Sequence, residues 1–282
     1  MEARREINPT LARRELALYF RRLREQRGYS LDQLSQQLGV AQSQASRLDA
    51  GARGLRLEDV QALSAWYGLA DGEKQRLLAL AEEARRRAWW QQIDLDDSYR
   101  TLIGLEQAAE SISEFCNMVV PGLLQTARYA SAAAEIGELR SAKTEQAVEV
   151  RMRRQKILLG PRSPELSVVI DEAVLARGAG GDDVMLEQLQ HLLDFAKRPR
   201  VTIQVIGFEE GMYPTGSSQF ILLDMGVRLP PVYYREDQLN RTDSSAEDDI
   251  RKARSLWRLL QSRALDPQRS MERISRYRDG LT

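Results

Sequence analysis

Five of six consecutive positions near the start of the chain carry side chains suited to hydrogen bonding rather than to covalent chemistry. Residues 42–47, QSQASR, offer amides, hydroxyls and a guanidinium. Glutamine can bond adenine at two atoms, arginine can bond guanine with both arms of its fork, and serine can bond either base. No acidic residue occurs between residues 33 and 48, so nothing on this stretch would repel phosphate. The stretch predicts contact with the base edges of double-stranded DNA.

Two short helices must hold these side chains in place. Ser30 is typical of a helix cap, and the apolar stripe of residues 31–38 ends at Gly39. A second helix is predicted from Gln42 to Ala50, with Ala45 and Leu48 facing inward. Only three residues, 39–41, join the two helices, which is the turn length of a helix-turn-helix motif. The second helix of such a motif enters the major groove.

The outward residues of this second helix are the candidate base contacts. Gln44 lies about 200° around the helix from Gln42, so it is a weaker candidate for a base contact than the other residues. The predicted base-contacting residues are Gln42, Ser43, Ser46, Arg47 and, with lower rank, Gln44.

Helical spacing also predicts helices at residues 11–27, 57–67 and 71–87, which completes an all-α domain of five helices over residues 1–90. Residues 1–56 hold 11 Arg and no Lys against six acids, a charge of +5, whereas the whole chain has 41 basic and 41 acidic residues. Residues 57–282 therefore carry −5. A basic first segment suits a polyanionic partner. A five-helix bundle of the same pattern can instead serve as a protein-binding module, and arginine-rich helices are often merely solvated.

The run RRLREQRGYSLDQLSQQLGVAQSQASRLDAG resembles the Xre/Cro class of DNA-binding domains. The resemblance implies an ion pair between Arg24 and Asp49, although the class more often has glutamate at the position of Asp49. It places base-facing sites on Gln42, Ser43 and Arg47. The phosphate contacts expected with it are Ser30, Arg53 and Arg56.

Beyond residue 90 the pattern changes to an α+β domain, residues 91–282. Helices are predicted at residues 102–115, 121–137, 143–160 and 183–198, with a closing helix at 246–265. Strands are predicted at 166–175, where the strand runs into a short helix, and at 201–208, 218–225 and 231–236. The expected fold is therefore an all-α five-helix helix-turn-helix domain followed by an α+β domain.

The larger domain shows no catalytic pattern. The chain has one histidine, His191, and one cysteine, Cys116, and the glycines at 178–181 lack the spacing of a phosphate-binding loop. We expect no enzyme activity, no cofactor and no metal. The alternative is an enzyme or toxin-like effector whose helix-turn-helix autoregulates its own gene. No apolar run approaches membrane-spanning length, and a single cysteine suits a reducing compartment, so a cytoplasmic, nucleoid-associated protein is expected.

Several segments of this domain, among them PGLLQT at residues 121–126 and RMRRQKIL at 151–158, are similar to the WhiJ-like group of actinobacterial regulators. The resemblance implies transcriptional regulation, often beside a gene for a small companion protein. Because one recognition helix reads few base pairs, we expect a homodimer on a near-palindromic operator in double-stranded DNA. The candidate region for a small-molecule effector or partner protein comprises Pro121, Gln125, Tyr129, Met212, Tyr213 and Thr215. A helix start buried in the core would explain Pro121, Gln125 and Tyr129 equally well, and an ordinary connection between strands would explain Met212, Tyr213 and Thr215.

Overall fold

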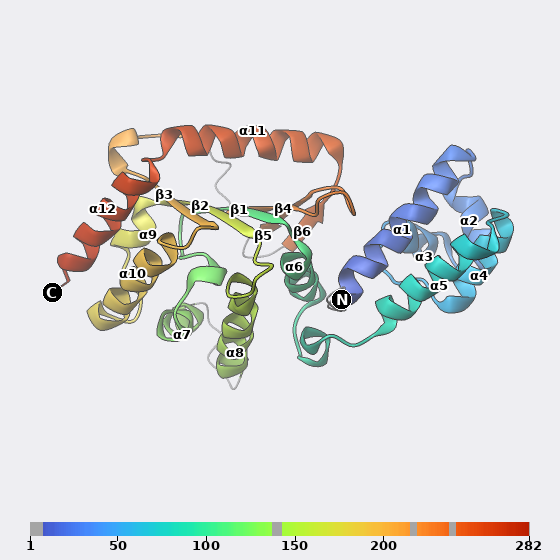
Figure 1. Ribbon diagram of the computed structural model, residues 1–282, viewed down its shortest axis with the longest axis horizontal. Helices are drawn as coiled ribbons and strands as arrows, with labels where there is room; N and C mark the ends of the chain where they lie inside the picture. Colours follow the sequence, from blue (N-terminus) through green and yellow to red (C-terminus); the bar gives the residue numbers. More distant parts are fainter. Residues whose placement is uncertain (1–7, 137–142, 215–218, 237–240, 282) are drawn as a thin grey trace. The chain divides into compact units, whose positions relative to one another are not determined.

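The computed structural model describes residues 8–136, 143–214, 219–236 and 241–281. Its contacts divide the chain into two units. The first extends to Ala108 and includes Val227–Leu229, and the second comprises Ala109–Gly226 together with the chain from Pro230 onward. Each unit has its own elements, labelled in Figure 1. The sequence boundary near residue 90 falls within the short 3₁₀ helix η1.

The N-terminal unit is entirely helical. Its elements are α1 (Pro9–Gln26), α2 (Leu31–Leu38), α3 (Gln42–Asp49), α4 (Leu57–Trp66), α5 (Asp71–Arg85), η1 (Trp89–Gln92) and α6 (Asp97–Ala108). α1 packs against α5, α6 and α3. The predicted five-helix domain is confirmed, and the structure adds η1 and α6 to it.

One apolar core holds these helices together. Leu16 and Phe20 of α1 meet Leu34 of α2, Ala45 of α3 and Leu63 of α4, each at most 5% exposed. Burying side chains of this size removes enough apolar surface from water to stabilise the unit by about 1.5–3 kcal/mol for each large one. The positions of α2 and α3 are therefore fixed by the same core.

The second unit is built on a six-stranded mixed sheet. Its strands are β1 (Ser111–Cys116), β2 (Glu165–Asp171), β3 (Val201–Ile206), β4 (Phe220–Asp224), β5 (Val232–Glu236) and β6 (Arg241–Ser244), in the spatial order β3-β2-β1-β4-β5-β6. β1, β2 and β3 run parallel, whereas β4, β5 and β6 pair antiparallel. The predicted α+β class is confirmed.

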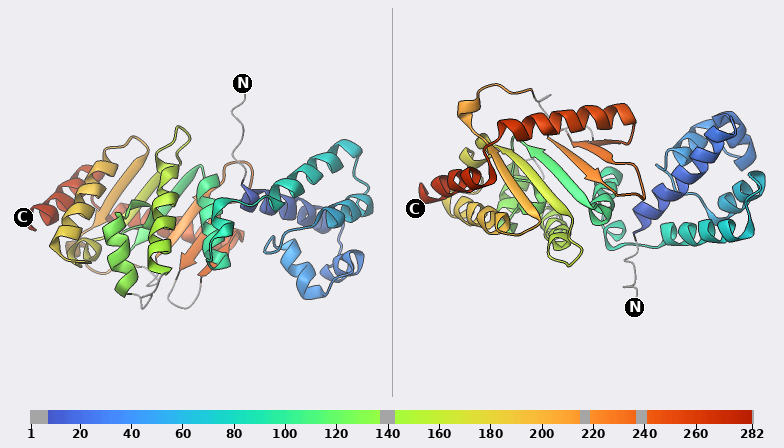
Figure 2. Two further views of the ribbon diagram at one scale, coloured as in Figure 1. Left: turned by 90° about the horizontal axis from the view of Figure 1, so that it is seen from below. Right: turned by 45° about the horizontal axis from the view of Figure 1, so that its top comes forward.

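Helices cover both faces of this sheet. On one face lies α11 (Glu247–Arg263), whose Ile250, Ala253, Trp257 and Leu260 pack on Phe115 and its neighbours. The opposite face carries η2 (Gly122–Leu124), α7 (Ala127–Ile136), α8 (Lys143–Gln155), η3 (Lys156–Leu158), α9 (Glu172–Ala176) and α10 (Asp182–Ala196) (Figures 1 and 2). Coverage on both sides explains why Val168, Val169 and Ile170 are buried in succession in β2.

The last helix, α12 (Pro267–Asp279), protects an edge of the sheet. Ser270 Oγ accepts the backbone N–H of Val205 at 3.0 Å, and Leu265 N–H donates to the Val205 carbonyl at 2.9 Å. β3 is the edge strand, and unpaired edge groups otherwise invite pairing with another chain. The segment from 265 to 270 therefore satisfies backbone groups that the sheet leaves open. η4 (Phe208–Glu210) follows β3 directly.

Three details of the sequence prediction were wrong. Residues 102–115 are not one helix, because α6 ends at Ala108 and residues 111–116 form β1 in the middle of the sheet. The segment after Pro121 begins as a 3₁₀ turn, and the α-helix starts only at Ala127. β6 and α12 were not predicted. β1 depends on partners distant in sequence, whereas β6 pairs with the preceding strand β5, and α12 begins at a local cap, Asp266, followed by Pro267.

Candidate nucleic-acid interface

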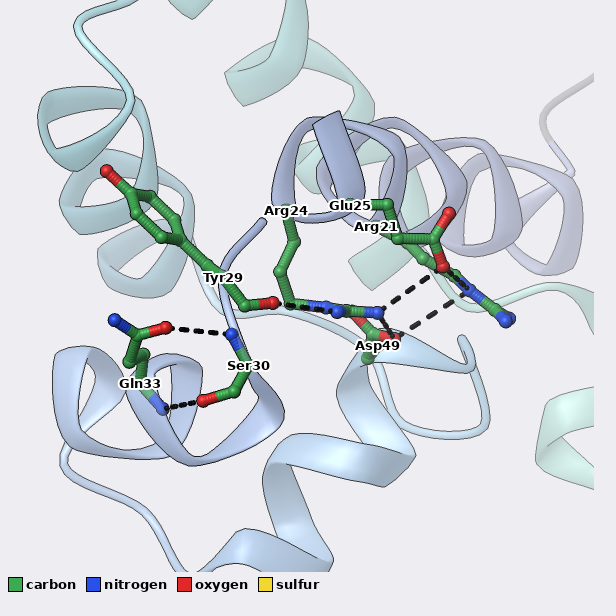
Figure 3. Close-up of polar contacts among 7 residues, drawn as sticks. All are labelled: Arg21, Arg24, Glu25, Tyr29, Ser30, Gln33 and Asp49. Carbon is green, nitrogen blue, oxygen red and sulfur yellow. Dashed lines mark hydrogen bonds and ion pairs between the residues drawn. The ribbon is translucent and has the colours of Figure 1, made fainter. Parts of the chain in front are cut away.

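The helix-turn-helix begins with a reciprocal cap on α2. Ser30 Oγ accepts the Gln33 backbone N–H at 3.2 Å, and Gln33 Oε1 accepts the Ser30 backbone N–H at 2.8 Å (Figure 3). Two backbone donors that the helix itself leaves open are thereby satisfied. Ser30 is exposed and its hydroxyl proton remains available to donate, so the residue can cap α2 and contact a phosphate at once.

Gly39 makes the turn between α2 and α3. Its φ is 61°, the left-handed region that favours glycine, and Val40 N–H bonds the Ser35 carbonyl at 3.1 Å. The chain then re-enters a helix at Gln42 without a side-chain cap. The open N-terminal turn of α3 leaves backbone N–H groups for an external acceptor such as a phosphate.

An ion pair ties α3 to α1. Arg24 Nε donates to Asp49 Oδ1 at 2.8 Å and Arg24 Nη2 donates to Asp49 Oδ2 at 2.9 Å (Figure 3). The hydrogen bond to Asp49 raises the pKa of Arg24 above its ordinary value. Arg24 Nη1 also donates to the Tyr29 carbonyl at 3.0 Å. The guanidinium therefore joins the end of α3 to the connection between α1 and α2.

The uncharged polar side chains of α3 and Arg47 face outward. Gln42, Ser43, Gln44, Ser46 and Arg47 are exposed, whereas Ala45 and Leu48 are buried at 0% and 4%. The two buried residues hold the helix against the core while five hydrogen-bonding side chains stay in solvent. All five predicted base-contacting side chains, Gln44 included, are therefore exposed.

The two predicted arginine phosphate contacts differ in their surroundings. Arg53 is exposed and makes no ion pair among the described residues. Arg56 is 62% exposed, but its Nη2 lies 2.9 Å from Asp59 Oδ1 and its Nη1 lies 3.4 Å from Glu58 Oε2. Hydrogen bonding to Asp59 raises the pKa of Arg56. A phosphate at Arg56 has to compete with two carboxylates, and one at Arg53 does not.

Comparison with known families covers both units. Residues 15–78 match a family described as Helix-turn-helix domain. Residues 99–276 match a family described as Domain of unknown function (DUF5753). The chain belongs to the DUF5753 family. No curated protein and no solved structure matches it.

The helix-turn-helix match suggests DNA binding, and the DUF5753 match names no activity. The matched helix-turn-helix segment contains all of α2, α3 and α4. The contacts described above for α2 and α3 therefore lie within the segment that matches the helix-turn-helix family. In the described ranges, no helix has both the length and the apolar character to cross a bilayer.

Within the DUF5753 region, three candidate effector residues are interior. Pro121 is buried, Gln125 is 3% exposed and Tyr129 is 2% exposed. Gln125 Nε2 donates to the Val120 carbonyl at 2.8 Å, and the Val120 N–H donates to the Tyr129 hydroxyl at 3.2 Å. Burial raises the pKa of Tyr129. These residues pack the segment after β1, so a ligand reaches them only if that segment opens.

Neighbouring buried amides complete this packing. Gln188 of α10, 0% exposed, accepts the Thr126 N–H and donates to the Leu124 carbonyl, both at 2.7 Å. Gln155 of α8 donates to the Gln125 carbonyl at 2.5 Å. The PGLLQT segment, which carries the resemblance, is therefore held by hydrogen bonds to two helices.

The other candidate effector residues lie after β3. Met212 is fully exposed, whereas Tyr213 packs edge-on against Phe115 at 6.1 Å between ring centroids. The Tyr213 hydroxyl donates to Asp171, and burial together with this bond raises the pKa of Tyr213. Thr215 lies outside the described residues. No hydrogen bond or ring contact among the described residues joins this group to Pro121, Gln125 or Tyr129.

Sequence reasoning missed one contributor to the α3 anchor. Arg21 Nε lies 3.8 Å from Asp49 Oδ2 and 3.0 Å from Glu25 Oε1. Arg21 and Arg24 are three residues apart on α1, so both side chains reach Asp49 (Figure 3). That spacing is the signal by which the sequence could have revealed Arg21.

Proposed function

We propose that this protein is a sequence-specific regulator of transcription that binds double-stranded DNA and has no enzyme activity of its own. The observation that carries the proposal is the outward face of α3, where five hydrogen-bonding side chains and no acid are held on a helix anchored by its core and by Arg24. Family similarity over residues 15–78 supports it.

In the proposed complex α3 enters the major groove. Gln42 bonds adenine and Arg47 bonds guanine, each with two hydrogen bonds, while Ser43 and Ser46 adapt to either base. Gln44 contributes from the side of the helix. Ser30, Arg53 and Arg56 contact phosphates and set the register of the protein on the duplex.

The DUF5753 unit is proposed to dimerise and to receive the regulatory signal. A homodimer presents two copies of α3 to a near-palindromic operator and so reads twice as many bases. The signal is a small molecule or a small companion protein, in keeping with the resemblance to the WhiJ-like actinobacterial group. This regulator would act at the nucleoid in the cytoplasm.

Selection from random-sequence duplexes tests the proposal. The full-length protein should enrich a motif with two related halves, and it should bind that duplex typically 10³–10⁷ times more tightly than unrelated DNA. Enrichment of no motif, with equal affinity for all duplexes, would sink sequence-specific binding. Light scattering on the same protein, with and without the selected duplex, tests the dimer, and a monomer in both conditions contradicts it.

Two single variants separate the proposed roles on the selected duplex. Arg47→Ala should lose about 1–3 kcal/mol and relax the preference at one base position of each half-site. Arg53→Ala should weaken binding to all duplexes alike and lower the slope of log affinity against log salt by about one for each phosphate that the protein no longer neutralises. If Arg47→Ala also weakened all duplexes alike, Arg47 would be a phosphate contact instead.

A further inference from the structure

A cavity of about 850 Å³ lies within the N-terminal unit, and none of the five polar α3 residues lines it. Its walls come from the first turns of α1, from Ala52 in the loop after α3, from the end of α5, and from the segment that leads through η1 into α6. Small-molecule sites typically measure about 300–1,000 Å³. The cavity is therefore large enough for a metabolite the size of a nucleotide.

The lining of this cavity is strongly basic. Five arginines line it against one acid, an excess of four positive charges: Arg13, Arg85, Arg86, Arg87 and Arg100 against Asp97. Arg85, Arg86 and Arg87 are exposed, and no ion pair to any of the three occurs in the described part of the chain. Cations gathered around one cavity repel each other and attract a multivalent anion.

Two buried donors on lining residues lack acceptors. Trp90 is 1% exposed, and its Nε1–H has no hydrogen-bond partner within the described ranges. Arg100 donates from Nη1 to Asp97 at 3.0 Å and from Nη2 to the Ile93 carbonyl at 2.8 Å, but its buried Nε–H has no partner. Buried N–H groups are nearly always bonded, and exceptions point to a missing ion or ligand. Both residues line the cavity, but the two nitrogens are themselves buried, so an oxyanion reaches them only if the lining side chains move.

We propose that this cavity binds a small phosphorylated metabolite that carries at least two phosphate groups. Guanidinium forks match phosphate oxygens with paired, charge-assisted hydrogen bonds. One phosphate carries about two negative charges and offsets about half of the excess of four, whereas two or more phosphates can balance it. Gln91, Gln92 and Thr101 provide neutral hydrogen-bonding groups for the rest of the ligand.

The cavity is also connected to the loop that follows α3. A Cβ placed on Gly54 would lie 3.5 Å from Arg13 Cδ, and one on Gly51 would lie 3.2 Å from Ala17 Cβ. The loop that carries Arg53 thus rests on the helix that supplies Arg13 to the cavity. A ligand that repositions Arg13 should change the affinity for DNA, and this coupling, unlike the binding itself, rests on the proposed function.

Calorimetric titration of the full-length protein without DNA tests the binding. Sodium triphosphate and ATP, at physiological ionic strength, should each saturate one site per chain. Arg86→Gln and Arg87→Gln remove exposed charges without disturbing the core, and each should weaken binding about tenfold, the effect of one charge-assisted hydrogen bond. Arg22→Gln is the matched control, since Arg22 is an exposed arginine of α1 outside this cavity, and it should leave the affinity unchanged.

Three outcomes overturn the proposal. The first is the absence of saturable heat with either phosphate probe. The second is an equal loss of affinity in Arg22→Gln and in the cavity variants. The third is binding of citrate as tight as that of triphosphate, which would assign the site to carboxylates. A protein that binds triphosphate but selects no DNA motif would contradict the proposed function and leave this site standing. If the cavity variants weaken DNA binding while triphosphate gives no heat, the arginines contact DNA instead.

Discussion

Arg24 and Asp49 connect the first and third helices of the DNA-binding unit through two parallel hydrogen bonds, 2.8 and 2.9 Å long. Their side chains are only 12% and 9% exposed, so water screens the pair weakly. A paired fork fixes direction as well as distance, because both donors lie in the guanidinium plane. The orientation of α3, and with it the direction of its outward side chains, therefore depends on α1.

Asp49→Ala should loosen α3 from α1. The change leaves the partly buried guanidinium of Arg24 without its carboxylate, which we expect to cost about 2 kcal/mol. Hydrogen exchange of the full-length protein, measured on peptides from α2 and α3, should show the loss of protection. Glu25→Ala is the control, because Glu25 is 52% exposed and its contacts with Arg21 at 3.0 Å and Arg24 at 3.5 Å are surface pairs, for which about 0.5 kcal/mol is typical. Equal effects of the two variants would contradict an anchoring role.

Two glycine substitutions should have opposite effects. A Cβ meets nothing within 4 Å at either Gly39 or Gly72, so neither change creates a clash. Gly39 has φ 61°, where alanine is strained, and Gly39→Ala should destabilise the N-terminal unit by about 1 kcal/mol. Gly72 lies in the first turn of α5, and Gly72→Ala should stabilise the unit by up to about 1 kcal/mol. Thermal unfolding checks both, and a loss in both variants would refute this reasoning.

The DNA-binding unit was predictable because its signals are local. Ser30 and Gln33 cap α2 within three residues of each other, and Gly39 follows its last turn. The stripe of Leu31, Leu34 and Leu38 lies on one face of a single helix. Such features need no information about distant parts of the chain, and the predicted bounds of α2 agree with the structure.

β1 shows why the second unit was harder to predict. Leu105, Ala109 and Ile112 recur at helical spacing, but Ile112 lies in a strand between β2 and β4. Ile112 pairs with Leu166 and with Leu223, more than 50 residues away, and strand preference depends on such neighbours. Likewise, Gln155 of α8 binds the Gln125 carbonyl, a contact that the local sequence does not reveal.

Arg273→Ala should loosen α12 from α9 and η4. Glu172 is 5% exposed and binds Arg273 Nη1 at 2.5 Å, the Tyr277 hydroxyl at 2.9 Å and the Phe208 N–H at 2.7 Å. Burial, with the bond to Glu172, raises the pKa of Tyr277 to about 12. Removing the cation leaves a buried carboxylate with neutral donors only, at a cost of about 2–3 kcal/mol.

Faster hydrogen exchange in α12 should report this change. The same variant should return the pKa of Glu209, which Arg273 holds below its usual value, toward the ordinary range. The matched control is Arg276→Ala, because Arg276 is an exposed arginine one turn further along α12. Protection in α12 that survived Arg273→Ala would show that the pairs made by Arg273 are not needed to hold the helix.

His191 should make the second unit less stable in mild acid. The ring lies 4.7 Å from the Phe195 ring on α10, and its buried Nε2 has no hydrogen-bond partner in the described ranges. Burial lowers the pKa of His191, although Asp194 and Glu187 act in the opposite direction and Arg198 adds to the lowering. The unfolded chain, with a histidine pKa of about 6.5, therefore takes up the proton first as the pH falls.

Stability should be fully present above that unfolded value and should decline as the pH falls from it to the lower pKa of the folded protein. The sequence has one histidine, so its imidazole proton resonance can be followed by NMR without assignment by mutation. The pH midpoint of this histidine titration in the folded protein should lie below about 6.5. His191→Phe keeps a ring beside Phe195 and removes the titrating group, so its melting temperature should change less between about pH 7 and pH 5.5 than that of the wild type. A midpoint above 6.5, or equal pH dependence in the two proteins, would show that the acidic neighbours outweigh burial at this position.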